Sequence, residues 1–395
     1  MKILFLTNVI PFPADNGKKM RTMSFIKSLS KEHVIDLIAI NSENIIDKKK
    51  YTDLSRYVNS IYIVRSSAGS YVMNVIKRLM CLFMLYPYSV YKSKSVHAAN
   101  KIREFLNKNK YDCIFCDGLH ITVNLFKING TIIIINEHNI EYLIYKRYVL
   151  NEKNLLKKFY AMIEMHKLQR YEQLQWKKMD HGIVCSDIDG NIIKEYDPCL
   201  RVTIIPNTID VASYGNITEK QVDSNILFLG ALDWIPNQDA VIFFFDKIYP
   251  LVKKKVSHVS FTVVGRNPTK KIKNLSKLDS SVKVTGTVDD VRPYLAQCAV
   301  FVVPLRMGSG TRLKILEAMA MKKVVVSTTI GAEGLEVTDN LDIVIADEPA
   351  DIAEKIIEIF HNNELKRRII QNSYNLVSCL YDSKIINKKF NSFFP

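Results

Sequence analysis

The stretch Val302-Val-Pro-Leu-Arg-Met-Gly-Ser-Gly-Thr-Arg-Leu-Lys-Ile-Leu-Glu-Ala-Met-Ala-Met321 carries the clearest structural signal in the chain. An apolar strand ends at Pro304, a loop with Gly308 and Gly310 follows, and a helix is expected to begin near Thr311. The unpaired N–H groups at a helix start favour an anion such as phosphate, and glycines let the backbone approach it closely. The stretch therefore predicts a strand, a turn that binds an anion, and a helix.

Helical spacing places Gly310, Leu313, Lys314 and Glu317 on one face of that helix. In one interpretation Lys314 approaches a diphosphate and Glu317 accepts hydrogen bonds from sugar hydroxyls. In the other, the helix belongs to the core and Lys314 and Glu317 form a surface pair three residues apart. Periodicity alone leaves both interpretations open.

Short apolar runs alternate with longer helical stretches along the whole chain, which is typical of parallel α/β layers. A helix is expected over 18–29, and one long charged helix from about Tyr142 to Lys178. The expected strands are 3–7, 35–40, 61–64, 113–116, 131–135, 182–185, 225–230, 260–264, 282–285, 299–303 and 324–327.

The two halves of the chain are expected to join at Ile204-Ile-Pro-Asn-Thr-Ile-Asp210, where Pro206 and Asn207 interrupt the pattern. We predict two doubly wound, Rossmann-like domains, 1–205 and 206–380, facing each other across a cleft. A C-terminal helix over 381–395 is expected to pack back on the first domain. In such sheets ligands bind beyond the carboxyl ends of the strands, where polar residues follow the strands in both halves.

The composition is that of a globular protein with an excess of positive charge. Of 395 residues, 48% are hydrophobic, and 55 Lys and Arg against 40 Asp and Glu give a formal net charge of +15. This balance favours anionic partners such as nucleic acid, phospholipid or phosphorylated small molecules, and charge alone does not choose among them.

The sequence does not indicate a signal peptide, a membrane-spanning helix or a metal or redox site at its Cys-x-x-Cys motif. The first residues are interpreted as a strand and not a signal peptide, because no small-residue cleavage site follows. No run approaches the roughly 18 apolar residues of a membrane-spanning helix. Cys113-Ile-Phe-Cys116 lies inside an apolar strand and is interpreted as two buried thiols in a reducing compartment.

The stretch from 302 to 321 closely resembles the donor-site signature of GT-B glycosyltransferases of the retaining family 4, in particular bacterial sugar transferases for exopolysaccharides and other surface glycans with a GSGTRLK-type loop. The resemblance continues through 324–328 and 331–335. Weaker matches occur in the expected order at Asn16-Gly17-Lys18, Glu137-His-Asn-Ile-Glu141, Val184-Cys-Ser-Asp187, Pro206-Asn207, Phe228-Leu-Gly230 and Asp233-Trp-Ile-Pro-Asn237.

The resemblance implies that the second domain binds a nucleotide sugar. Glu317 matches the second glutamate of the family's E-x7-E pair, which binds the ribose, while the first glutamate is replaced by Ser309. That replacement puts the identity of the donor sugar in doubt, because the missing carboxylate holds sugar hydroxyls in the family. The family's Arg and Lys in the first turn of this domain are also missing. Arg312 and Lys314 are the favoured replacements at the diphosphate. The full set of donor-site candidates is Gly308, Ser309, Gly310, Thr311, Arg312, Lys314, Glu317 and Arg266.

The first domain is expected to bind the acceptor. Asp117 and His120 follow a buried strand, and His138 follows the next one; these three are the catalytic candidates, because an imidazole titrates near neutrality and can orient or deprotonate a hydroxyl. Asn16, Gly17, Lys18 and Glu141 are candidates for a phosphate or acceptor loop. Asp187 and Asp189 form a DxD pattern, but they are expected to cap a helix and not to bind a metal.

The expected reaction moves a glycosyl group, with retention, from a nucleotide diphosphate sugar to a hydroxyl of a glycan or lipid-linked acceptor. No cofactor or obligatory metal is expected, and no nucleic acid partner. Two alternatives stay open: a non-hydrolysing nucleotide-sugar epimerase of the same architecture, and a non-catalytic basic protein that binds a membrane or nucleic acid.

Residues 70–94 combine an apolar helical stripe with Lys77, Arg78, Lys92 and Lys94. One interpretation is a helix that lies in a lipid headgroup layer and brings a cytoplasmic enzyme to the inner face of the membrane. The other is a buried helix packed on the first sheet. The stripe comprises Val72, Val75, Ile76, Leu79, Leu82, Phe83 and Tyr86.

Overall fold

The computed structural model describes residues 1–394 except 15, 42–52, 66–70, 127, 129, 216–218 and 220. The chain forms two compact units, one of residues 1–206 with 387–395 and one of residues 207–386. The chain first passes from one unit to the other after Pro206, one residue beyond the predicted domain boundary at 205. The cleft expected between the units stays a prediction.

The first unit is built on a seven-stranded parallel sheet with the strand order β3-β2-β1-β4-β5-β6-β7. Its strands are β1 (Lys2–Thr7), β2 (Val34–Asn41), β3 (Ser60–Arg65), β4 (Cys113–Asp117), β5 (Ile132–Asn136), β6 (His181–Val184) and β7 (Arg201–Ile204). Its helices are α1 (Gly17–Leu29), α3 (Tyr71–Leu82), α4 (Tyr88–Tyr91), α5 (Val96–Lys108), α6 (Glu141–Asn151), α7 (Leu155–Trp176) and α8 (Asp187–Tyr196), with a 3₁₀ turn η1 (Leu119–Asn124).

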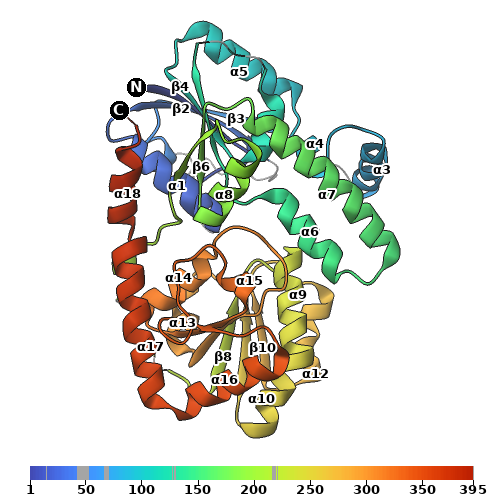
Figure 1. Ribbon diagram of the computed structural model, residues 1–395, viewed down its shortest axis with the longest axis vertical. Coiled ribbons are helices and arrows are strands. Elements are labelled where there is room, and N and C mark those ends of the chain that lie inside the picture. The colour runs from blue at the N-terminus through green and yellow to red at the C-terminus, as the bar shows by residue number, and fades with distance from the viewer. Residues whose placement is uncertain are drawn as a thin grey trace. The chain divides into compact units, whose positions relative to one another are not determined.

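The central strands are continuous apolar runs because helices cover both faces of the sheet (Figure 1). Every residue of β4 is buried, and in β1 only the first residue is not. Cys113 and Cys116 lie inside β4 as buried free thiols, as the sequence predicts.

The expected long helix over 142–178 is wrong, because the chain turns back on itself there. Helix α6 ends at Asn151 and α7 begins at Leu155, so the segment is a helical hairpin. The side chain of Asn154 caps α7 by accepting a hydrogen bond from the Lys157 N–H at 3.1 Å. Asparagine favours such caps over helix interiors, which explains the break.

The second unit repeats the design with a six-stranded parallel sheet in the order β10-β9-β8-β11-β12-β13. Its strands are β8 (Asn225–Leu229), β9 (Ser260–Val264), β10 (Val282–Gly286), β11 (Val300–Val303), β12 (Val324–Ser327) and β13 (Val344–Ile345). Its helices are α9 (Ile235–Phe243), α10 (Tyr249–Lys255), α11 (Lys270–Lys273), α12 (Leu275–Leu278), α13 (Arg292–Gln297), α14 (Leu313–Ala320), α15 (Thr329–Ala332), α16 (Pro349–His361) and α17 (Asn363–Leu376), with a 3₁₀ turn η2 (Val211–Tyr214).

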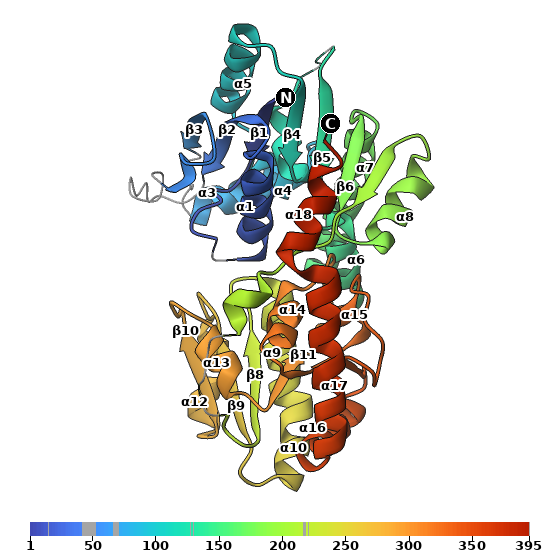
Figure 2. The ribbon, with the colours of Figure 1, turned by 90° about the vertical axis from the view of Figure 1, so that its left-hand side faces the viewer.

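The end of the chain returns to the first unit through α18 (Ser383–Asn391). Phe390 is fully buried and stacks on Phe25 of α1 with ring centroids 4.0 Å apart, beside Phe115 of β4. Figure 2 shows α18 next to α1. Residues 387–394 therefore complete the core of the first unit on the side of α1.

We predict that Phe390→Ala lowers the free energy of unfolding of the first unit by about 3–5 kcal/mol, because it removes a buried ring from an aromatic cluster. Urea unfolding measures this loss. Phe83→Ala, which removes a ring that is almost fully exposed, is the matched control and should change the free energy by less than about 0.5 kcal/mol. Equal effects of the two substitutions would contradict the packing described here.

Candidate active site

Both sheets reverse their strand order at one point. In the first unit β1 lies between β2 and β4, and in the second β8 lies between β9 and β11. The connections that follow the two neighbouring strands at this point go to opposite sides of the sheet. A crevice therefore opens outside the carboxyl ends of these strands, where doubly wound sheets bind ligands. The candidate residues of the two units follow these strands or the strands next to them.

In the second unit the loop after β11 has the backbone that its glycines permit. Gly308 has φ +130° and Gly310 has φ +74°, a region that disfavours other residues. Helix α14 begins at Leu313 with Arg312 as the capping residue, so the expected start near Thr311 is two residues too early. Gly310 consequently lies outside the helix and does not share its face with Lys314 and Glu317.

Arg312 has a different place from the predicted one at the diphosphate. Its side chain is buried, and its Nη1 donates to the carbonyl oxygens of Ser309 and Gly310. A Cβ atom on Gly308 would lie 2.7 Å from Arg312 Nη2. The guanidinium therefore braces the glycine loop from inside, as its planar fork of donors allows. Ser309 is buried in the same loop.

Lys314 lies at the strand-order reversal itself. Its Nζ donates to Asn237 Oδ1 at 2.9 Å and lies 4.4 Å from the centre of the Phe228 ring, a cation–π contact. Burial lowers the pKa of Lys314 to about 7. A Cβ atom on Gly230, just after β8, would lie 2.9 Å from Nζ, so only glycine leaves this space to the lysine. Asn237 and Phe228 are contacts that the sequence reasoning did not assign.

Glu317 projects from the next turn of α14. Tyr214 of η2 donates its hydroxyl hydrogen to Glu317 Oε1 at 2.9 Å, and burial raises the pKa of the carboxyl. Within the described part of the chain Glu317 Oε2 accepts no hydrogen bond, so this oxygen is the one available to a ligand. Thr311 is fixed by Asn207, whose Nδ2 donates to Thr311 Oγ1 at 2.6 Å. Asn207 and Tyr214 both come from the segment that enters the second unit.

Arg266 lies after β9, the strand next to β8. It is half-buried and forms a 3.8 Å ion pair with Asp233, which also accepts a hydrogen bond from Asn267. Arg266 thus remains a cation at the same edge of the sheet, although its own charge is partly compensated.

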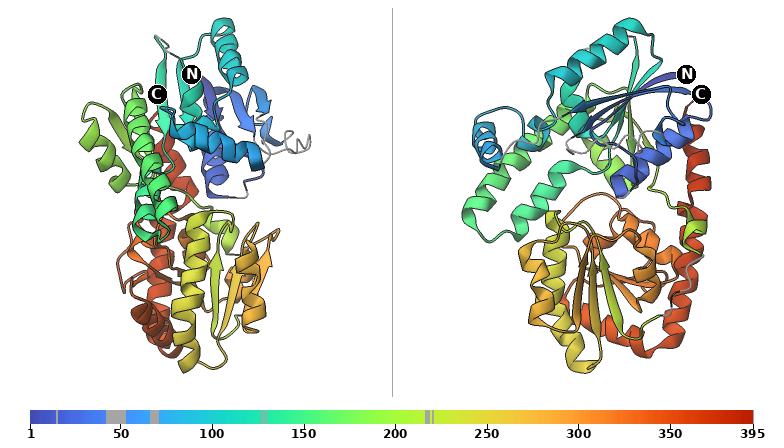
Figure 3. Two further views of the ribbon diagram at one scale, coloured as in Figure 1. Left: turned by 90° about the vertical axis from the view of Figure 1, so that its right-hand side faces the viewer. Right: turned by 180° about the vertical axis from the view of Figure 1, so that it is seen from behind.

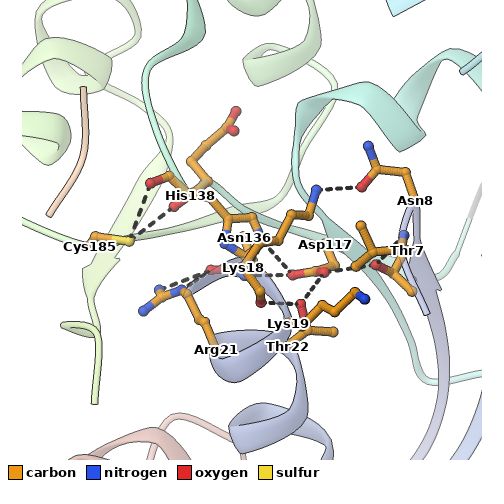
Figure 4. A network of polar contacts seen from close by, with 12 residues as sticks. Thr7, Asn8, Lys18, Lys19, Arg21, Thr22, Asp117, Asn136, His138 and Cys185 are labelled. Carbon is orange, nitrogen blue, oxygen red and sulfur yellow. Dashed lines mark hydrogen bonds and ion pairs between the residues drawn. The ribbon is translucent and has the colours of Figure 1, made fainter. Parts of the chain in front are cut away.

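In the first unit Asp117 is the centre of a buried polar network (Figure 4). Its Oδ2 accepts hydrogen bonds from the hydroxyls of Thr7 and Thr22 at 2.9 and 2.7 Å, and its Oδ1 accepts from Asn136 Nδ2 at 2.8 Å. His138 Nε2 lies 2.8 Å from the same Oδ1. Burial by itself raises the pKa of Asp117, but His138, Lys18 and the hydrogen bonds outweigh it and hold that pKa well below its usual range.

The predicted catalytic role of Asp117 does not fit this burial, because a fully buried carboxylate cannot touch a substrate. Its place is that of a positioning residue for His138. A carboxylate only accepts hydrogen bonds, so Nε2 of His138 carries the hydrogen and Nδ1 is the acceptor nitrogen of the neutral ring. Burial lowers the pKa of His138, although Asp117 acts to raise it.

Arg21 supports this network and was missed by the sequence reasoning. Its Nε and Nη2 donate to Asn136 Oδ1 at 3.1 and 2.9 Å, and its Nη1 donates to the Ile205 carbonyl at 2.7 Å. The sequence contained one signal for this role: an arginine on the buried face of α1, one turn after the start of the helix. The guanidinium orients the Asn136 amide so that its NH₂ points at Asp117.

The predicted loop Asn16, Gly17 and Lys18 divides into two roles. Asn16 caps α1 by accepting from the Lys19 N–H at 3.1 Å, and Gly17 is the first residue of the helix. Lys18 reaches the site, where its Nζ donates to Asn8 Oδ1. A Cβ on Gly118 would lie 3.4 Å both from Lys18 Nζ and from His138 Cδ2, so this glycine, with φ +95°, separates the two side chains.

His120 and Glu141 lie near the same edge. His120 belongs to η1. Its pKa is lowered, mainly by burial; the nearby Glu141 acts to raise it, and Lys18, Lys92 and His138 act to lower it further. Glu141 begins α6, with its N–H bound to Glu172 Oε1 at 2.7 Å. The structure therefore gathers His120, His138, Lys18 and Glu141 around the end of β4.

Asp187 and Asp189 do not cap α8 as predicted. Ser186 is the capping residue, and its hydroxyl accepts from the Asp189 N–H at 3.2 Å and donates to Asp189 Oδ2 at 2.8 Å. The Ser and Asp three residues apart form a reciprocal pair at the helix start. Among the residues that the structure describes, no group of three or more His, Cys, Asp and Glu side chains is arranged to hold a metal ion.

We predict that Asp117→Asn lowers the pKa of His138, because the substitution removes the carboxylate that raises it and keeps the size of the side chain. Titration of the His138 ring resonances by NMR measures the shift, and His97, which contacts Tyr62 on the opposite edge strand, serves as the internal control. An unchanged or raised pKa of His138 would show that Asp117 does not govern this ring.

Comparison with known proteins agrees with this geometry. Residues 223–362 match the glycosyl transferases group 1 family. An uncharacterized 44.6 kDa protein in the cps region of Klebsiella pneumoniae is 26% identical, over the whole of this chain and 99% of its own.

Two solved structures show the same fold over the whole chain. TarM of S. aureus in complex with Fondaparinux, alpha-GlcNAc-glycerol and UDP is 12% identical with a TM-score of 0.71, and 99% of it is covered. HepE of Anabaena in complex with UDP and glucose is 15% identical with a TM-score of 0.65, also with 99% covered. The GT-B fold predicted from the sequence is confirmed. Because residues 223–362 match the group 1 glycosyl transferases and both units have the GT-B fold, the chain is a glycosyltransferase of the GT-B fold.

Proposed function

We propose that this glycosyltransferase moves a sugar, with retention of configuration, from a nucleotide diphosphate sugar to an acceptor hydroxyl, as the resemblance to family 4 implies. One observation carries the proposal. A cation and a carboxylate, Lys314 and Glu317, project from successive turns of a helix that follows a glycine loop at the strand-order reversal. UDP in the complexes of TarM and HepE supports the same class of donor.

The proposed donor site assigns one task to each part of the loop and helix. The diphosphate lies at the start of α14, where backbone N–H groups and Lys314 neutralise its charge. Glu317, held by Tyr214, accepts hydrogen bonds from the ribose hydroxyls. Arg312 acts through the loop that it braces and not by contact with the donor.

The proposed acceptor site lies at the end of β4 in the first unit. His138, oriented by Asp117, contacts the acceptor hydroxyl, and the departing diphosphate takes part in removing its proton. Lys18, His120 and Glu141 form the polar wall around it. No metal takes part in this proposal, because stabilisation of the leaving diphosphate comes from fixed cations and backbone donors.

We further propose a role in surface-glycan synthesis with a glycan or lipid-linked acceptor, and peripheral contact of a cytoplasmic enzyme with the membrane through residues 70–94. The full-length relative in the cps region supports the first part. None of the described helices is long and apolar enough to cross a membrane.

Glu317→Ala is predicted to weaken binding of the nucleotide sugar by about 100-fold, since it removes charge-assisted hydrogen bonds worth about 1.5–3 kcal/mol. A thermal-shift screen of UDP-, GDP-, ADP- and CMP-sugars selects the donor, and titration calorimetry measures its affinity. Tyr214→Phe should cost a smaller factor. Glu354→Ala, at an exposed glutamate of α16, is the control and should bind normally.

Normal binding by Glu317→Ala would refute the donor site. Incubation of the enzyme with donor alone separates transfer from epimerisation, because an epimerase converts the nucleotide sugar without an acceptor.

Binding of a nucleotide sugar is predicted to weaken as the pH rises through about 7. The pKa of Lys314 is lowered to about 7 without a ligand, and a bound diphosphate raises it because the charged form is then stabilised. Affinity is therefore constant at lower pH and falls at higher pH, where binding takes up a proton. Calorimetry in buffers of different ionisation enthalpy measures this uptake.

Lys314→Arg should bind with little pH dependence over the same range, since arginine stays charged. Proton uptake that persists in this variant would assign the effect to another group.

A further inference from the structure

The first unit exposes an unusual number of apolar side chains on α3 and the residues that follow it. The expected stripe is not buried against the sheet: Phe83 is 94% exposed, and Leu79 and Ile76 are 57% and 45% exposed. Val72 of the stripe has a side chain outside the described part of the structure. The exposed apolar residues here are Met73, Val75, Ile76, Leu79, Met80, Phe83 and Leu85.

A second exposed apolar group lies where α6 and α7 meet, at residues 150–159, which we name the hairpin tip. Leu155 and Leu156 are 80% and 83% exposed, and Leu150 and Phe159 are exposed as well. Side chains of this size are rarely left in water at the turn of a helical hairpin without a partner. This group was not predicted, because the segment was expected to be one continuous helix.

The two groups belong to one side of the first unit. Lys167 of α7 donates its Nζ hydrogens to the carbonyl oxygens of Cys81 and Leu82, which ties the end of α3 to the middle of α7. Seen from the side on which α3 lies, α3 and the α6–α7 hairpin both face the viewer (Figure 3, left), and Figure 1 shows them at the same edge of the unit.

Both groups belong to stretches of the chain that are rich in basic residues. Residues 71–94 contain Lys77, Arg78, Lys92 and Lys94 and no acidic residue, and residues 142–158 contain five basic residues and only Glu152 as an acid. The basic residues of the second stretch are Lys146, Arg147, Lys153, Lys157 and Lys158. Exposed apolar side chains in segments that also carry an excess of cations match the two layers of an anionic bilayer surface, acyl chains below and phosphates above.

We propose that the hairpin tip and α3 together form the membrane-docking surface, and that their partner is a lipid bilayer with anionic headgroups. Leu155, Leu156 and Phe159 enter the acyl boundary from the hairpin, and Leu79 and Phe83 enter it from α3, while the lysines contact phosphates. This deepens the contact proposed above for residues 70–94 by adding a second element that fixes the orientation of the first unit on the membrane. Docking itself does not depend on glycosyl transfer.

Co-sedimentation with phosphatidylcholine vesicles containing about one third phosphatidylglycerol tests the surface. The full chain should bind these vesicles, and binding should weaken at high salt and on vesicles of phosphatidylcholine alone. Leu155→Asn with Leu156→Asn should lower the partition coefficient about tenfold or more, since both apolar side chains leave the bilayer. Leu278→Asn and Val96→Asn replace comparably exposed apolar residues elsewhere and should bind like the parent.

A charge pair gives the second test. Lys157→Glu with Lys158→Glu should lose most binding to the anionic vesicles, whereas Lys254→Glu with Lys255→Glu, a neighbouring pair on α10, should not. Circular dichroism and the affinity for the nucleotide sugar verify that each variant is folded, and they report on the donor site independently of docking.

Equal binding by the tip variants and their controls would overturn the proposal. A second outcome would also overturn it: the parent chain does not bind anionic vesicles but forms oligomers, and Leu155→Asn with Leu156→Asn dissociates these oligomers. The surface would then be an interface between copies.

Discussion

The reversal of strand order in each parallel sheet is the constraint on which both candidate sites depend. Because β1 and β4, and likewise β8 and β11, send their crossovers to opposite sides of the sheet, a crevice is expected outside their carboxyl ends. Asp117 ends β4, and Gly230 and the glycine loop follow β8 and β11. At such an edge backbone donors and side chains from distant parts of the sequence converge without leaving the rigid sheet.

Burial of charge is the second common feature of the two sites. Asp117 is kept ionised in the interior by four hydrogen-bond donors, and Nη1 of Arg312 donates to two carbonyls of its own loop. Lys314 differs, because its contacts are the uncharged Asn237 and Phe228, while burial and the charge of Arg312 lower its pKa. A desolvated cation of this kind is stabilised by an incoming anion. The first two charges shape the sites, and the third one is ready for a ligand.

The sequence predicted the repeated strands and the glycine loop well, because buried parallel strands and helix starts leave local patterns. All of the expected strands are present, and the two that were missed, β7 and β13, are short edge strands. The roles of Arg312, Arg21 and Asp117 were not predictable, because they depend on which atoms a folded side chain meets. The break at Asn154 was not predicted, since a polar helix and a polar turn have similar composition. The exposed hairpin tip was therefore not predicted either.

Hydrogen–deuterium exchange with and without the selected nucleotide sugar determines whether the donor lies at the strand-order reversal of the second unit. We expect protection of amides in the loop at 305–312 and the first turn of α14, together with 230–237 after β8, and little change at the edge strands β10 and β13. Protection confined to the first unit, or spread over surfaces away from this loop, would contradict this donor site.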